Sequence, residues 1–266
     1  MGLHLGQRKL LLTEVNFLTN YHDLSKNVVY IGAAPGHHID FLSTLFPDHT
    51  FYLYDPRDFA IDKTDKILIF QKYFELNDAE GLENFLLISD IRQEVNVNTM
   101  SQQEICNIVM EDMNLQKNWL LNLKPKVSLL KFRIPLFCDS FEYFNGELLE
   151  QPWAPESTYE TRLIVKENIV NKIYKTSDYL LLLNRLKECR RTELFDHGLP
   201  LKRVPGLDNC FDCNLEISIW KEYLKKFGEI SNTNISNLMK KTGIKLKRYL
   251  TKTPHGKLRY NNIKVY

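Results

Sequence analysis

The sequence predicts a doubly wound, Rossmann-like α/β sheet with a basic C-terminal extension. Two observations carry this prediction. Short β-branched or aromatic segments alternate with segments of helical periodicity, which is typical of parallel strands joined by helices. Several expected strands also end at a glycine or a charged residue, the edge at which ligands bind to such sheets. The 266 residues are enough for one large domain or two small ones.

The first half of the chain opens with a helix over about residues 7–22, where Leu11, Val15 and Leu18 share one face. A second helix is expected over residues 36–46, because Pro47 stops it. Four short apolar segments are the expected strands: residues 27–32, 50–55, 66–71 and 84–90.

The second half is expected to begin with a longer helix. Ser101 and Glu104 have the spacing of a capping box, and the helix should run to about residue 122. Three further elements are expected: a strand at 127–133, a strand at 160–166 and a helix at 173–189. We expect the main domain to cover residues 1–228 and the basic tail to cover residues 229–266.

Charge is distributed unevenly along the chain. The net charge is +2, yet the last 36 residues contain no acid. They hold nine basic residues: Lys240, Lys241, Lys245, Lys247, Arg248, Lys252, Lys257, Arg259 and Lys264. Such a segment is typical of polyanion binding, with a solvated extension or a subunit-docking segment as alternatives. Two short helices and a hairpin at 255–266 would make it winged-helix-like.

Composition excludes several classes of protein. No apolar run approaches the roughly 20 residues that span a bilayer, and the N-terminus lacks the pattern of a secretory signal. We therefore expect an intracellular protein with five reduced cysteines and no membrane partner. Cys210 and Cys213 form a lone CxxC without a second pair at zinc-finger spacing, so no metal site is predicted.

A small-residue loop joins the first strand to the next helix. Gly32 and Gly36 bracket this loop, and Asp55 ends the following strand, where related folds place an acid on ribose hydroxyls. The spacing is not GxGxxG, which favours a nucleoside cofactor without a pyrophosphate, such as S-adenosylmethionine. The alternative is a purely structural turn.

Four charged residues lie at the ends of apolar segments or interrupt them. These are Lys9, Asp90, Lys131 and Glu160. Two lysines and two acids suit methyl transfer to an alcohol, because a lysine with a lowered pKa can take the hydroxyl proton while carboxylates position it. A plain ion pair or a snorkelling lysine is the alternative for Lys131.

Six motifs occur in the order of a known family: GQRKLLLTE, VVYIGAAPGHHI, YDPRD, LLISDIR, LLKFRIP and QPWAPESTYETRL. Together they resemble the poxvirus-type cap-specific mRNA 2′-O-methyltransferases, which also act as poly(A) polymerase small subunits. The resemblance covers about residues 6–185. The glycine loop and the Lys-Asp-Lys-Glu tetrad are shared with the wider RrmJ-like ribose methyltransferases, whereas Tyr30 and QPWAP favour the viral branch.

The resemblance implies roles for individual residues. Lys131 would be the base or activator of the ribose 2′-hydroxyl. Lys9 and Glu160 would tune and orient Lys131, and Asp90 would lie beside the methyl donor. The S-adenosylmethionine contacts would be Gln7, Tyr30, Gly32, Gly36, Asp55, Arg57, Phe74 and Asp90.

Contacts with RNA are also implied. Arg133 and Arg162 would hold RNA phosphate or ribose, and Asp139 or Asp178 would bind the edge of the cap base. The aromatic rings that grip the cap in the family have no direct match, and Phe137, Trp153 or Tyr159 are the substitutes.

The expected function is 2′-O-methylation of the first transcribed nucleotide of capped mRNA. The expected partners are the capped mRNA 5′ end and a poly(A) polymerase catalytic subunit, in the host cytoplasm or virion for a viral protein. Two alternatives remain: methylation of internal RNA riboses, and a non-catalytic RNA-binding or polymerase processivity subunit.

Overall fold

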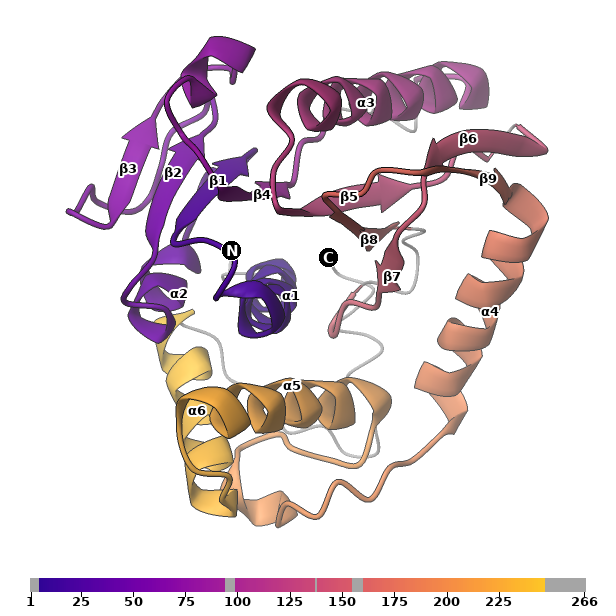
Figure 1. Cartoon of the computed structure of the whole chain (residues 1–266). Coiled ribbons are helices and arrows are strands. Elements are labelled where there is room, and N and C mark those ends of the chain that lie inside the picture. Colours follow the sequence, from indigo (N-terminus) through magenta and orange to yellow (C-terminus); the bar gives the residue numbers. More distant parts are fainter. Residues whose placement is uncertain (1–4, 94–98, 137, 155–159, 247–266) are drawn as a thin grey trace.

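The computed structural model describes residues 5–93, 99–136, 138–154 and 160–246, in which a mixed sheet lies between two layers of helices (Figure 1). The strands of this sheet are β1 (Asn27–Ile31), β2 (Thr50–Tyr54), β3 (Ile67–Phe70), β4 (Phe85–Ser89), β5 (Val127–Arg133), β7 (Glu147–Leu149) and β8 (Glu160–Lys166). Their order is β3-β2-β1-β4-β5-β8-β7. Strands β1 to β5 are parallel, and β8 and β7 add an antiparallel edge.

Alternating side chains of the strands form two cores. Val28 and Tyr30 of β1 belong to one core, and Val29 and Ile31 belong to the other. The helices are α1 (Leu5–Tyr21), α2 (Ile39–Leu45), α3 (Gln102–Leu123), α4 (Thr176–Thr192), α5 (Phe211–Phe227) and α6 (Asn232–Lys245), with short 3₁₀ turns η1 (Leu76–Ala79) and η2 (Leu201–Arg203). The first core lies under α1, α2, α5 and α6, and the second under α3 and α4. The α/β architecture with helices on both faces is therefore confirmed.

Local signals placed most of the expected elements correctly. The capping box at the start of α3 is present: the Ser101 hydroxyl accepts from the Glu104 amide at 3.2 Å, and the Glu104 carboxylate accepts from the Ser101 amide at 2.7 Å. Helix α2 begins at Ile39 rather than Gly36, so the small-residue loop is longer than expected.

The expected helix at 173–189 is wrong at its start. Residues Asn171–Lys175 form strand β9, which pairs with β6 (Ser140–Phe144) in a separate two-stranded sheet. The rings of Tyr174 and Phe141 stack at 5.5 Å between these strands. This pairing joins segments about 30 residues apart, so local periodicity does not reveal it. Strands β6 and β7 and helix α5 were also not predicted.

Helix α6 packs against α5 and the first core. Ile235, Met239 and Leu246 are buried in the cluster that contains residues of α1 and α5. The expected boundary at residue 228 falls in the short turn between α5 and α6. The expected hairpin at 255–266 lies outside the described residues. Among the helices that the structure describes, none is both long and apolar enough to cross a membrane.

Candidate functional site

The four residues of the expected tetrad lie in one ion-pair cluster. Lys9 of α1 donates from Nζ to Glu160 Oε1 at 2.9 Å, and Lys131 of β5 donates from Nζ to Asp90 Oδ1 at 2.9 Å. Lys131 Nζ also lies 3.4 Å from Glu160 Oε2, which links the two pairs. All four side chains are largely buried, with exposed fractions between 10% and 17%.

Arg162 is a third cation of this cluster. Its Nη2 donates to Asp90 Oδ1 at 2.6 Å and lies 3.4 Å from Glu160 Oε1. Its side chain is only 3% exposed, so the guanidinium faces the carboxylates of the protein. The sequence resemblance suggested an RNA contact for Arg162, whereas the structure places it inside the tetrad.

The sheet register explains why these side chains meet. In the antiparallel pair β5–β8, Lys131 lies opposite Arg162 and Arg133 lies opposite Glu160. Residues two apart on a strand share a face, so Glu160 and Arg162 point to the same side as Lys131. Asp90 follows β4, the neighbour of β5, and its amide donates to Ile31 O at 2.9 Å. The cluster therefore forms at the carboxyl ends of the parallel strands, as expected.

Three cations face two carboxylates, and the pKa values reflect this balance. Burial acts to raise the pKa of Asp90, but Arg162 and Lys131 outweigh it and lower that pKa to about 2. Burial likewise opposes ionisation of Glu160, but Lys131 and Lys9 hold its pKa well below the usual range. Burial lowers the pKa of Lys9, although Glu160 acts in the opposite direction. Both carboxylates are thus anionic at neutral pH.

Gly32 follows β1 beside the cluster, at a position that leaves no room for a side chain. Its φ is +80°, and an added Cβ would lie 2.8 Å from the carbonyl carbon and oxygen of Asp90. Gly36, at the end of the same loop, has a φ of +72°. The glycine at position 32 thus lets the loop pack its backbone directly against the main chain that follows β4.

Asp55 anchors this loop to the end of β2. Its Oδ2 accepts from the Ala34 amide at 3.1 Å, and its two carboxylate oxygens accept from the Arg57 guanidinium at 2.9 and 2.8 Å. Arg57 also donates to Ala34 O at 3.1 Å. Asp55 is buried, whereas the Arg57 side chain is mostly exposed. Asp55 therefore positions both the loop and Arg57.

Gln7 and Tyr30, two more of the residues expected to contact the cofactor, belong to a buried hydrogen-bond network. His38 Nδ1 lies 2.8 Å from Gln7 Oε1, and Glu14 joins His38 to Tyr30. The Tyr30 hydroxyl donates to Glu14 Oε1 at 2.7 Å, and burial and the nearby carboxylate raise the pKa of Tyr30 well above its usual value. Phe74 lies apart from this network, in the second core, edge-on to Tyr54 and Trp119.

Unlike the tetrad, the remaining residues expected to contact RNA or the cap do not lie in one cluster. Arg133 is half-buried at the end of β5, where burial and Arg92 lower its pKa. Asp139 and Asp178 flank the start of α4, since the Thr176 amide donates to Asp139 O at 3.0 Å and Asp178 lies in the first turn. Trp153 is only 2% exposed and lies in the first core. Phe137 and Tyr159 lie outside the described residues.

Sequence reasoning missed the buried ion pair that holds α1 against α5. Arg8 Nε donates to Glu216 Oε2 at 2.8 Å, and Trp153 Nε1 donates to the same oxygen at 2.7 Å. Arg8 is the residue before Lys9, so this pair fixes the start of the helix that carries Lys9. A glutamate among the apolar residues Cys213 and Ile217 of α5 was the available signal, because a buried carboxylate needs partners.

Comparison with known proteins places the chain in a family. Residues 3–191 match the family described as "Poly A polymerase regulatory subunit". The cap-specific mRNA (nucleoside-2′-O-)-methyltransferase of fowlpox virus is 32% identical over an alignment of 183 residues, and the match covers 60% of this chain and 57% of that protein. The myxoma virus (strain Lausanne) protein of the same name is 30% identical over an alignment of 180 residues, and the match covers 60% of this chain and 52% of that protein.

The chain thus spans little more than half the length of these relatives. Among solved structures, bluetongue virus VP4, described as a multifunctional RNA-capping production line, has a TM-score of 0.52 at 15% identity, covering 64% of this chain and 30% of that chain. A likeness at this identity supports the fold alone. The family match covers most of the chain, including the glycine loop and every member of the tetrad. The chain therefore belongs to the poly(A) polymerase regulatory subunit family.

Proposed function

We propose that this protein transfers a methyl group from S-adenosylmethionine to the ribose 2′-hydroxyl of the first transcribed nucleotide of capped mRNA. The observation that carries the proposal is the buried cluster of Lys9, Asp90, Lys131, Glu160 and Arg162. The viral relatives, which carry the name of that activity, give independent support.

The cluster is suited to activating an alcohol. A ribose hydroxyl is a poor nucleophile until its proton is removed or its developing negative charge is stabilised. Lys131 is held between Asp90 and Glu160, with Nζ at 2.9 and 3.4 Å from their oxygens. We assign Lys131, in its uncharged form, as the group that takes the hydroxyl proton as the oxygen attacks the methyl group. Lys131 then becomes an ammonium, and S-adenosylhomocysteine is the leaving group. Lys9, Glu160 and Arg162 set the position of Lys131 and its local potential.

The glycine loop fits the nucleoside part of S-adenosylmethionine. The bare backbone at Gly32 lies against Asp90, and Asp55 is fixed at the end of β2 with both oxygens oriented by Arg57. We assign Asp55 and Asp90 as carboxylates facing the donor, with Gln7, Gly36 and Arg57 around them. Tyr30 and Phe74 would support the donor site through packing, because both side chains are buried in the cores. The bound cofactor would supply the electrophilic methyl group.

A basic surface for RNA would adjoin this cluster. Arg133 is half-buried at the end of β5, opposite Glu160, and we assign it a contact with RNA phosphate or ribose. Asp139 and Asp178 are the candidate carboxylates for the edge of the cap base. The proposed partners are the capped mRNA 5′ end and, because of the family match, a poly(A) polymerase catalytic subunit. An intracellular location would be consistent with both.

The test is methyl transfer from a labelled donor to three RNAs of one sequence. They carry a methylated cap, an unmethylated cap or a 5′ triphosphate. We expect label in the methylated-cap RNA, mapped by nuclease digestion to the ribose of the first nucleotide. Label at internal riboses, independent of the 5′ end, would favour the internal methyltransferase instead. RNA binding without any label, in protein that binds S-adenosylhomocysteine, would refute the enzymatic proposal.

A further inference from the structure

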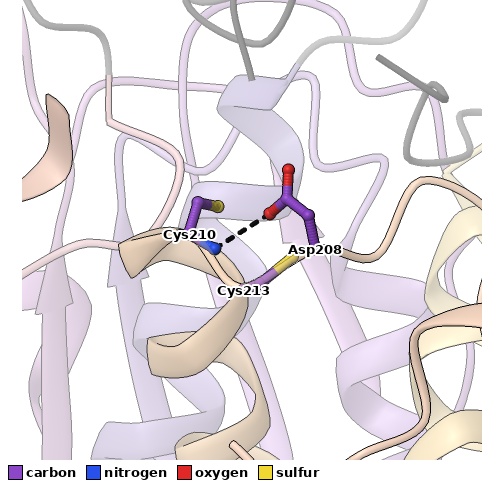
Figure 2. A group of neighbouring side chains, drawn as sticks. All are labelled: Asp208, Cys210 and Cys213. Carbon is purple, nitrogen blue, oxygen red and sulfur yellow. Dashed lines mark hydrogen bonds between the residues drawn. The ribbon is translucent and has the colours of Figure 1, made fainter. Parts of the chain in front are cut away.

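A second group of chemically reactive side chains lies at the start of α5, outside the tetrad and the glycine loop. Asp208, Cys210 and Cys213 point toward one another across the first turn of this helix (Figure 2). One carboxylate oxygen and the two sulfur atoms all lie within 4.8 Å of one another. Asp208 lies two residues before Cys210, the N-cap of α5, and Cys213 lies in the first turn of that helix, so one short segment, residues 208–213, supplies all three side chains.

The spacing of these atoms is close to that of a tetrahedral metal site. With metal–sulfur bonds of about 2.3 Å, two thiolates on one tetrahedral Zn²⁺ lie about 3.8 Å apart. Closing the present group onto an ion therefore needs side-chain shifts of about 1 Å or less. Two sulfurs and one carboxylate oxygen are a donor set that suits Zn²⁺ better than the oxygen-seeking Mg²⁺ or Ca²⁺.

The surroundings orient the ligands and balance their charge. Asp208 Oδ1 accepts from the Cys210 amide at 3.0 Å, which fixes the carboxylate beside the sulfurs (Figure 2). Cys210 is the N-cap residue of the 17-residue helix α5, and the helix N-terminus stabilises thiolates. Two thiolates, one carboxylate and Zn²⁺ would sum to one negative charge, which this helix end compensates.

Among the described residues, the neighbouring His197 and Asp212 are engaged elsewhere, so the described part of the chain supplies three ligands. His197 Nε2 lies 3.1 Å from Asp208 O, and its Nδ1 accepts from the Leu199 amide at 3.1 Å. Asp212, in the same helical turn, accepts from the Trp153 amide at 2.9 Å. Neither side chain can add a ligand without losing a bond that the structure shows. The fourth position would therefore be filled by water, as in other three-ligand zinc sites.

We propose that Asp208, Cys210 and Cys213 bind one Zn²⁺ ion, with water as the fourth ligand. Binding displaces the two thiol protons to solvent, and no oxidation or reduction occurs. The ion holds the end of the connection between α4 and α5, at residues 208–210, against the first turn of the helix that carries Glu216. This connection contains only the short turn η2 and an isolated bridge between Leu194 and Cys210. The proposal is independent of the methyltransferase proposal.

The test is metal titration of the full chain after treatment with a chelator and a reductant. Co²⁺ serves as the first probe, because thiolate ligands give it a charge-transfer absorption band. We expect one equivalent of Co²⁺ per chain, displaced by one equivalent of Zn²⁺, and an increase in the midpoint temperature of unfolding when Zn²⁺ is added.

Two variants remove ligands with little change in shape: Cys210→Ser and Asp208→Asn. We expect each to weaken Zn²⁺ binding by at least about tenfold, since loss even of an outer-shell partner commonly costs that much. Cys138→Ser, a cysteine between β5 and β6, is the matched control and should bind like the unaltered chain. Absence of saturable binding at one equivalent would overturn the proposal. So would equal affinity in Cys210→Ser, Asp208→Asn and the control.

Discussion

Replacing Lys131 by methionine should abolish methyl transfer while leaving the fold intact. The structure shows why the fold should tolerate the change. Without the ammonium, Asp90 keeps its bond to Arg162 at 2.6 Å, and Glu160 keeps Lys9 at 2.9 Å. Two cations then face two carboxylates, so no buried charge is left unpaired. The free energy of unfolding should fall by only about 1–3 kcal/mol, the range for one charged hydrogen bond.

The effect on rate should be much larger than the effect on stability. Removal of a general base typically costs about 10²–10⁴-fold. At 1.36 kcal/mol per factor of ten, this is about 2.7–5.4 kcal/mol of activation free energy. Lys131→Arg should fail as well, because a guanidinium stays protonated and cannot accept the proton.

Single-turnover methyl transfer, with donor and capped RNA saturating, measures the chemical step directly. Lys126→Met is the matched control, since Lys126 Nζ bonds Glu167 at 3.0 Å at the surface, outside the cluster. Calorimetry with S-adenosylhomocysteine should show nearly unchanged affinity in Lys131→Met, which separates loss of chemistry from loss of the site. A transfer rate in folded Lys131→Met close to that of the control would refute the assignment of Lys131.

Three further predictions concern the donor site, the ion-pair cluster and the basic C-terminal segment of the sequence. Asp55→Ala should weaken S-adenosylhomocysteine binding by about 1–3 kcal/mol, the range for lost polar partners, and unchanged calorimetric affinity in a folded variant would exclude Asp55 from the donor site. The pKa of Asp90, lowered to about 2, stabilises the folded state above the unfolded value of about 4, and this contribution is lost as pH falls through about 2. Urea unfolding of Asp90→Asn should thus depend less on pH over this window, and an unchanged dependence would contradict the pairing. Deleting residues 247–266 should weaken RNA binding and flatten its salt dependence by about 0.7 per lost phosphate contact, without changing donor affinity; identical slopes would show that this segment does not contact phosphate.

The sequence alone predicted the features that depend on residues close together along the chain. The alternation of apolar segments located β1 to β5 and β8, and Ser101 with Glu104 located the start of α3. The small residues after β1 predicted a loop between that strand and the next helix, and Gly32 in this loop has a positive φ, which glycine readily adopts. These features are local because strand pleat, helix capping and backbone freedom are properties of a few consecutive residues.

Tertiary structure decided which distant residues meet. The register of β5 and β8 brought Arg162 into the cluster with Asp90, 72 positions earlier, where its guanidinium bonds that carboxylate. Strand β9 formed where a helix was expected, because it pairs with β6. The Arg8–Glu216 pair joins residues 208 positions apart. Such contacts arise from the packing of whole elements and from the need of buried charges for partners, neither of which leaves a periodic pattern in the chain.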